Sequence, residues 1–203
     1  MMGPQQQPSM LLTLHALRLL GFADTESVAA RFGQDPHDVE RLLIDAGANG
    51  WASRSSFGGT RGWSLTVAGR TENERLLAEE LDSVGGQAAV TAVHAKFAPL
   101  NAGVVAACSK LQLRWLAEGS QRHDGIDEPT QQTFTQALAS FSGLEVRLTA
   151  VLPRFSGYAE RLELAVENAA TEPAWLTATD RDSFHRIWFE LHEDLIATLG
   201  IRR

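Results

Sequence analysis

One short run of the sequence constrains the fold more than any other, because it spaces small and apolar residues as two helices joined by a tight turn require. Ala29 places a small residue where two steeply crossing helices approach, and Gly33 supplies a turn residue that tolerates a positive φ angle. The remaining apolar side chains of the run point inward and hold the two helices together. These side chains are Val28, Phe32, Val39 and Leu42. The spacing therefore predicts a helix-turn-helix.

The segments on either side of this run extend the prediction to three helices and a β-hairpin. Periodic apolar residues, capping residues and glycines predict helices over about residues 11–21, 25–32 and 36–46. Two strand-like segments follow at residues 51–54 and 63–67, separated by a polar, glycine-rich loop. Three helices followed by a hairpin define a winged helix-turn-helix.

The rest of the chain is predicted to be almost wholly helical. Residues 1–9 have the composition of a flexible tail, and a charged helix over residues 71–84 leads to Gly85-Gly86, the predicted domain boundary. The sequence thus predicts a winged-helix domain over residues 10–84 and an all-α domain over residues 85–203. The predicted helices of the second domain span 87–98, 99–116, 129–152, 158–170 and 179–200.

Two parts of the sequence resemble known families. The helix-turn-helix spacing and the segment Arg61–Arg70, which reads RGWSLTVAGR, resemble the MarR-like winged-helix regulators and their wing exit of a strand followed by Leu-Thr-x-x-Gly-Arg. Residues 97–101, 152–155 and 185–195 resemble the helical C-terminal domain of uncharacterised bacterial winged-helix proteins. The resemblance implies a two-part regulator, and it implies no known ligand.

The charge balance argues against a general polyanion binder. The chain of 203 residues has a net charge of −7, and residues 1–83 hold seven arginines against eleven acidic residues. The overall field therefore repels phosphates, so any affinity for nucleic acid has to come from a local basic surface. Such a surface is predicted between Trp51 and Arg70, where three arginines occur and no acidic residue does.

The candidate DNA contacts lie in the third predicted helix and in the hairpin. Gln, His and Arg side chains on a recognition helix read base edges, while an arginine at a glycine-flanked loop apex enters the minor groove and hydroxyls bond phosphates. The candidates are Gln34, Asp35, His37, Asp38 and Arg41 in the helix and Arg54, Ser55, Thr60 and Arg61 in the hairpin. Asp35, Asp38 and Glu40 oppose phosphates, which leaves open a winged helix that contacts protein instead.

The last predicted helix carries a second candidate site. His185, Trp188 and His192 share its apolar face with Phe189, Leu195, Ile196 and Leu199. The opposite face is predicted to carry mostly Arg186, Glu190, Glu193 and Asp194. The two histidines fit buried core or interface positions, a small-molecule pocket or a metal site. Their separation of seven residues exceeds the one-turn pairing of zinc-binding helices, so no metal or cofactor is expected. Cys108, the single cysteine, fits a small buried apolar residue.

These patterns together predict a DNA-binding transcriptional regulator that acts as a homodimer and responds to a small-molecule effector through its helical domain. The alternative is a winged-helix module that binds protein and no DNA. No nucleophile elbow, paired carboxylate site or phosphate-binding loop is evident, so the chain is not expected to be an enzyme. The absence of a membrane-length apolar run and of a signal peptide predicts a cytoplasmic protein with no membrane partner.

Overall fold

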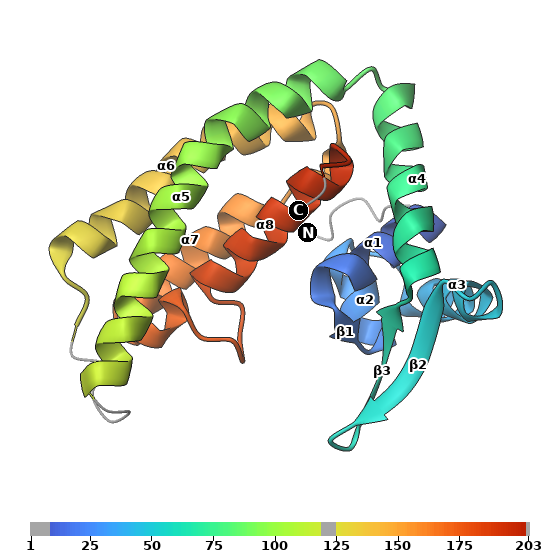
Figure 1. The fold of residues 1–203 in the computed structure, drawn as a ribbon, viewed down its shortest axis with the longest axis horizontal. Helices are drawn as coiled ribbons and strands as arrows, with labels where there is room; N and C mark the ends of the chain where they lie inside the picture. The colour runs from blue at the N-terminus through green and yellow to red at the C-terminus, as the bar shows by residue number, and fades with distance from the viewer. Residues whose placement is uncertain (1–8, 119–124, 202–203) are drawn as a thin grey trace. The chain divides into compact units, whose positions relative to one another are not determined.

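The computed structural model describes residues 9–118 and 125–201 (Figure 1). Within those residues it contains eight α-helices, two short 3₁₀ helices and one three-stranded antiparallel sheet. The chain is therefore mainly helical with a small sheet, in agreement with the predicted helical content. It divides into two compact units: the first ends at Ser83 and the second comprises Val84–Leu199, while Gly200 and Ile201 belong with the first.

The first unit consists of three helices, a hairpin with one additional strand, and a closing helix. In chain order these elements are α1 (Met10–Leu20), β1 (Phe22–Ala23), α2 (Thr25–Arg31), α3 (Pro36–Ala48), β2 (Ala52–Phe57), β3 (Thr60–Leu65) and α4 (Val67–Ser83). The strands are ordered β1-β3-β2, and both pairs are antiparallel. The two-residue strand β1 was not predicted, because two residues are too few to show a period.

The two helices and the turn between them form where the spacing predicts, and of the four apolar residues expected to point inward Leu42 is only half-buried. Ala29 is buried at the approach of α2 to α3, and Gly33 adopts a φ angle of 62° in the turn. Asp24 caps α2, where its carboxylate accepts a hydrogen bond from the Ser27 N–H at 2.8 Å. Hydrogen bonding from the Ser27 side chain, and then from its backbone N–H, lowers the pKa of Asp24. Asp35 caps α3 in the same way. Local capping and turn residues therefore fix these two helices.

The hairpin is longer and its turn tighter than predicted. The strands β2 and β3 remain paired as far as Phe57 and Thr60, so the turn contains only Gly58 and Gly59, with φ angles of 58° and 84°. Two successive residues with positive φ make the two-residue turn that matches the twist of paired strands, and glycine adopts it without strain. The predicted loop over residues 55–62 is therefore wrong.

A close approach of backbones joins the hairpin to α4. The Thr66 hydroxyl donates to the Gly50 carbonyl oxygen at 2.6 Å, and it accepts a hydrogen bond from the Gly69 N–H at 3.0 Å. A Cβ atom on Gly69 would lie 1.9 Å from the Trp51 carbonyl oxygen. Only glycine therefore fits at Gly69, one turn into α4. The predicted strand over residues 63–67 ends too late, since Val67 is the first residue of α4.

The second unit is built from four long helices. They are α5 (Gln87–Glu118), α6 (Glu128–Thr149), α7 (Tyr158–Ala169) and α8 (Phe184–Thr198), with the 3₁₀ helices η1 (Pro153–Phe155) and η2 (Pro173–Leu176) between them. Helix α5 packs against α6 and α8, and α7 also packs against α6 and α8, so the four helices enclose one core (Figure 1). Aromatic rings fill much of that core. The fully buried rings are those of Phe97, Phe134, Phe141, Phe155, Tyr158, Phe184 and Trp188.

Three helix boundaries in this unit differ from the prediction. Residues 87–116 form one continuous helix through Pro99, because burial of the side chains on either side of the proline outweighs the one backbone hydrogen bond that proline removes. Helix α6 ends at Thr149 rather than at residue 152. Helix α8 begins at Phe184 rather than at Thr179, and the Ser183 hydroxyl caps it by accepting from the Arg186 N–H.

The faces predicted for the last helix are wrong in part. Glu190 and Asp194 are both buried, whereas Arg186 is exposed and Glu193 is half-buried. Phe189, predicted for the apolar face, is 51% exposed. Asp194 forms an ion pair with Arg154 of η1, and the side chains of both residues are at most 1% exposed. Tyr158 donates its hydroxyl hydrogen to the Asp194 carboxylate at 3.0 Å, and Arg154 donates a second hydrogen bond to the Thr198 hydroxyl at 2.7 Å. The interior therefore contains a hydrogen-bonded ion pair that the periodicity of one helix does not reveal.

Cys108 is buried on α5, as predicted, and its burial has a chemical consequence. Removal from water disfavours the thiolate and raises the pKa of the thiol to about 12. At pH 8 the thiolate fraction of the folded chain is then about 10⁻⁴, against roughly a quarter for an unfolded cysteine. We expect a disulfide reagent such as DTNB to label the native protein at least about 1,000-fold more slowly than the urea-unfolded protein. Rapid labelling of the native chain would contradict this burial.

No helix in the described parts of the chain is long and apolar enough to cross a lipid bilayer.

Candidate nucleic-acid interface

Helix α3 packs through one side and exposes the other. Val39, Leu43 and Ala46 are buried in the first unit, whereas His37 and Arg41 are exposed. Asp35 lies at the N-cap, where its carboxylate accepts a hydrogen bond from the His37 N–H at 2.8 Å. The exposed side of α3 therefore offers an imidazole and a guanidinium near its N-terminal end.

Gln34 does not belong to this exposed side. It precedes α3 and is only 5% exposed, and its backbone N–H donates to the Ala29 carbonyl oxygen at 2.9 Å. The turn at Gly33 directs the next residue back into the first unit, so the prediction that Gln34 faces outward is wrong. The other four helix candidates remain accessible: Asp35, His37 and Arg41 are exposed, and Asp38 is half-buried.

Strand pairing places two of the predicted arginines on one face of the hairpin. Arg54 pairs with Trp63, and Ser56 pairs with Arg61. Directly paired residues, and residues two apart on one strand, point to the same face of a sheet, so Arg54 and Arg61 share a face. The Trp63 ring identifies that face as the one toward α3, since an added Cβ on Gly47 of α3 would lie 3.4 Å from it.

The other two hairpin candidates lie elsewhere. By the same alternation, Ser55 and Thr60 point to the opposite face from the arginines. Arg61 is a strand residue rather than the apex residue predicted, because the apex consists of Gly58 and Gly59. The structure therefore brings the arginines of the hairpin to the side of α3 and separates them from the two hydroxyls.

A shallow, open hollow lies where the start of α3 meets the hairpin. It is lined by Thr25, Glu26, Pro36, His37, Glu40 and Arg54. The Glu40 carboxylate accepts a hydrogen bond from the Thr25 hydroxyl and lies 3.9 Å from the Arg54 guanidinium. With two carboxylates and one guanidinium, the hollow itself is unsuited to a phosphate group. Any phosphate that binds to this surface would have to contact cations around the hollow.

The three arginines around the hollow, Arg41, Arg54 and Arg61, differ in the contacts that their guanidinium groups make. Arg41 donates to the Asp38 carboxylate at 2.6 Å, although its side chain is 76% exposed. The Arg54 guanidinium lies over the Trp63 ring, 5.4 Å from its centroid, which fixes its position. Arg61 is exposed towards the end of the hairpin. Surface ion pairs of this kind are weak, so a phosphate can displace a carboxylate partner at low cost.

The three residues proposed for a ligand pocket lie in a densely packed region. Trp188 stacks on Phe97 and Phe184, with ring centroids 4.9 and 5.5 Å apart, and its indole N–H donates to the Asn101 amide oxygen at 3.0 Å. The His192 ring also stacks on Phe97, with ring centroids 5.8 Å apart. Partial burial lowers the pKa of His185, because removal from water disfavours the charged imidazolium. Aromatic rings therefore occupy the interior beside Trp188.

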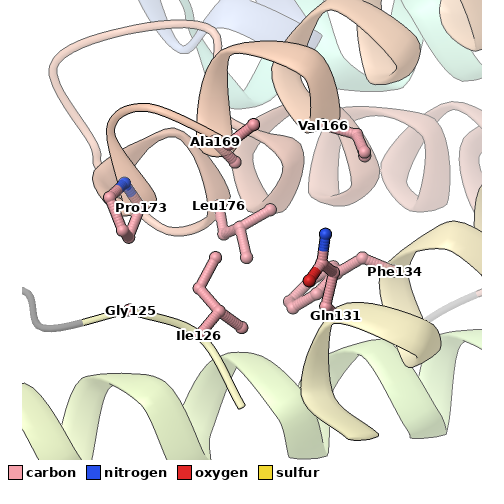
Figure 2. Close-up of a pocket in the computed structure, with 9 residues that line it drawn as sticks. Gly125, Ile126, Gln131, Phe134, Val166, Ala169, Pro173 and Leu176 are labelled. Atoms are coloured by element: carbon pink, nitrogen blue, oxygen red, sulfur yellow. The ribbon is translucent and has the colours of Figure 1, made fainter. Parts of the chain in front are cut away.

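A hollow of about 190 Å³ occurs elsewhere in the second unit (Figure 2). Its walls come from α6, α7, η2 and the segment before α6. Among the described lining residues, Gln131 is the one with a polar side chain. The lining residues are Gly125, Ile126, Gln131, Phe134, Val166, Ala169, Ala170, Pro173 and Leu176. None of the three predicted pocket residues is among them. No sequence motif signals this hollow, because its walls come from separate elements that meet only after folding.

Within the described residues, no group of three or more His, Cys, Asp or Glu side chains is arranged to hold a metal ion. Comparisons with protein-family models, with curated proteins and with solved structures find no match to this chain. Function therefore has to be inferred from the geometry of the chain itself.

Proposed function

We propose that this chain is a DNA-binding transcriptional regulator whose first unit is a winged helix. In this proposal α3 enters the major groove and the β2–β3 hairpin lies along the neighbouring backbone. The observation that carries it is the position of Arg54 and Arg61 on the hairpin face toward α3, within a segment from Trp51 to Arg70 that contains no acidic residue.

The exposed side of α3 fits this role in size and chemistry. Thirteen residues make a helix roughly 20 Å long, which the major groove accommodates. His37 and Arg41 are exposed on it and are side chains that bond base edges or phosphates. Asp38 holds Arg41 in the unbound protein and would be displaced when the arginine meets a phosphate.

The acidic balance of the chain makes a homodimer part of the proposal. One copy offers only a few arginines against a net charge of −7, so its affinity for DNA is low. Two copies double the number of phosphates neutralised and match two half-sites about one helical turn apart. The hollow in the second unit is where a small, largely apolar effector would bind, with Gln131 as its hydrogen-bonding partner.

The experiment that tests DNA binding compares two arginine variants. Arg61→Ala is expected to weaken binding of the dimer to duplex DNA roughly 100-fold at low salt, because each of the two copies loses one charge-assisted hydrogen bond of about 1.5 kcal/mol. It is also expected to reduce the slope of log K against log salt by about 0.9 for each phosphate that the variant no longer neutralises. Fluorescence anisotropy of a labelled nonspecific duplex across salt concentrations measures both effects.

Arg75→Ala is the matched control, because it removes the same charge from α4, where Arg75 pairs with Glu72 and Glu79. It should leave the salt slope at the wild-type value. Equal slopes for the two variants would contradict the proposed role of the hairpin, and no binding even in dilute salt would contradict DNA binding altogether.

An absence of DNA binding even in dilute salt would favour the alternative function, a winged helix that binds protein. One observation supports that alternative: Ile44 on α3 is 54% exposed, and the helix also carries Asp38 and Asp45 on its accessible side. An exposed isoleucine on a helix that also carries accessible carboxylates fits a protein contact better than a phosphate backbone.

A further inference from the structure

The helices α5 and α6 carry far fewer charges than the charged helix α4. Four of 32 residues in α5 and three of 22 in α6 are Asp, Glu, Lys or Arg, against seven of 17 in α4. A helix that faces water normally has a charged outer face, as α4 does. The composition of α5 and α6 is therefore that of helices covered on more than one side.

The exposed side of α5 is largely apolar, although Lys96, Ser109, Lys110 and Gln112 are also exposed on this helix. Val90, Phe97, Val104 and Leu111 face the core of the second unit and are fully buried. On the outer side the exposed residues include Ala98, Ala102, Val105, Leu113 and Leu116. Leu113 and Leu116 are 67% and 80% exposed. An exposed apolar strip of this kind is typically covered by a partner, and the described residues leave the outer side of α5 open.

The outer side of α6 continues this surface. Ala139, Gly143, Val146 and Ala150 are exposed at intervals of four, three and four residues, which places them on one face of the helix. The two helices are direct neighbours, and Gly103 of α5 lies opposite Thr133 of α6. We call the two outer sides together the α5–α6 face.

We infer that the α5–α6 face is where a second copy of this chain binds. Small residues allow two helices to approach closely, and the isolated Val and Leu side chains between them fit the resulting gaps of an identical face. The chain has a net charge of −7, so two copies repel each other over most of their surface. A nearly uncharged face is where that repulsion is weakest.

The size of the α5–α6 face also fits a dimer. At 1.5 Å per residue the helices are roughly 48 and 33 Å long, and each presents a strip about 10 Å wide. The face then offers at most roughly 800 Å² per copy, which reaches the area that a standard stable protein interface buries on each side. The choice of a second copy as the partner rests on the homodimer of the proposed function, whereas the face itself does not depend on DNA binding.

The test is the mass of the full chain in solution at tens of micromolar, measured by light scattering or sedimentation without DNA. We expect a dimer of about 44 kDa, twice the 22.1 kDa of the chain. The double substitution Val105→Glu and Leu113→Glu is expected to raise the dimer dissociation constant at least 100-fold and to give a monomer. Circular dichroism should show unchanged helicity, because both side chains are exposed in the single chain.

Leu164→Glu on α7 is the matched control, because Leu164 is 51% exposed but its helix lies outside the α5–α6 face. It should remain a dimer. A monomeric wild type, a dimer that survives the double substitution, or dissociation of the Leu164→Glu variant overturns the inference. If the double glutamate variant fails to fold, the double substitution Val105→Gln and Leu113→Gln replaces it, and the same comparison of monomer and dimer mass applies. Since no DNA is present, these outcomes are independent of the Arg61→Ala measurement.

Discussion

Asp194→Ala is expected to lower the free energy of unfolding of the second unit by about 3–5 kcal/mol, the usual effect of removing one partner of a buried ion pair. The substitution leaves the Arg154 guanidinium buried without its carboxylate, and it removes the acceptor of the Tyr158 hydroxyl. Urea unfolding followed by tryptophan fluorescence measures the change, since Trp188 lies on the same helix, α8.

Two further variants separate the ion pair from general effects of substitution. Arg154→Met combined with Asp194→Leu removes both charges and is expected to recover most of that stability, because apolar residues of similar volume need no compensating charge. Arg75→Ala removes an arginine from an exposed ion-pair cluster on α4 and should leave the midpoint unchanged. A wild-type midpoint for Asp194→Ala would show that the ion pair is not buried in solution.

The elements that could be predicted from the sequence are those fixed by residues close together in the chain. Asp24 and Asp35 cap α2 and α3 through bonds to N–H groups two or three residues away, and Gly33 makes the turn by its own φ angle. The first three helices of the first unit, α1 to α3, and the existence of the hairpin followed from such local signals. Whether this arrangement serves as a winged helix stays a prediction.

The elements that were missed depend on interactions between residues distant in the chain. Arg154 and Asp194 are forty residues apart, so helical periodicity alone assigned Asp194 to a solvent face. Pro99 was expected to begin a new helix, but the packing of α5 against α6 and α8 carries the helix through it. Neither the buried ion pair nor the continuous helix through Pro99 could be deduced from the properties of a single segment.

The candidate interface shows the same division. The arginines of the hairpin were identified from the absence of acidic residues around them, a purely local property. Their common face toward α3 required the register of β2 on β3, which follows from the two-residue turn at Gly58 and Gly59. The eight-residue loop predicted instead had placed Arg61 at an apex. Gln34 was misplaced for a related reason, since the direction of the chain after Gly33 decides its burial.

Gly69→Ala is expected to lower the free energy of unfolding of the first unit by about 3 kcal/mol, the upper part of the range for overpacked sites. The usual effect of this substitution within a helix is the opposite, a stabilisation of about 1 kcal/mol from reduced chain entropy. At Gly69 the added Cβ would lie 1.9 Å from the Trp51 carbonyl oxygen and 2.7 Å from its carbonyl carbon. Both are backbone atoms, so no side chain can rotate away, and α4 has to shift from the hairpin.

Gly103→Ala on α5 is the control for Gly69→Ala, because its added Cβ would lie at an ordinary van der Waals distance, 3.9 Å, from the Thr133 methyl carbon. It is expected to stabilise the protein by about 0.5–1 kcal/mol, so the two glycines should change stability in opposite directions. Thermal and urea unfolding of both variants measure the sign of each stability change.

The Gly69→Ala variant should also bind duplex DNA more weakly than wild type if the hairpin contributes to binding, because α4 and the hairpin are joined through Thr66. Stabilisation by Gly69→Ala would show that α4 does not approach Trp51 closely. The claim that only glycine fits at position 69 of the Leu-Thr-x-x-Gly segment would then be wrong.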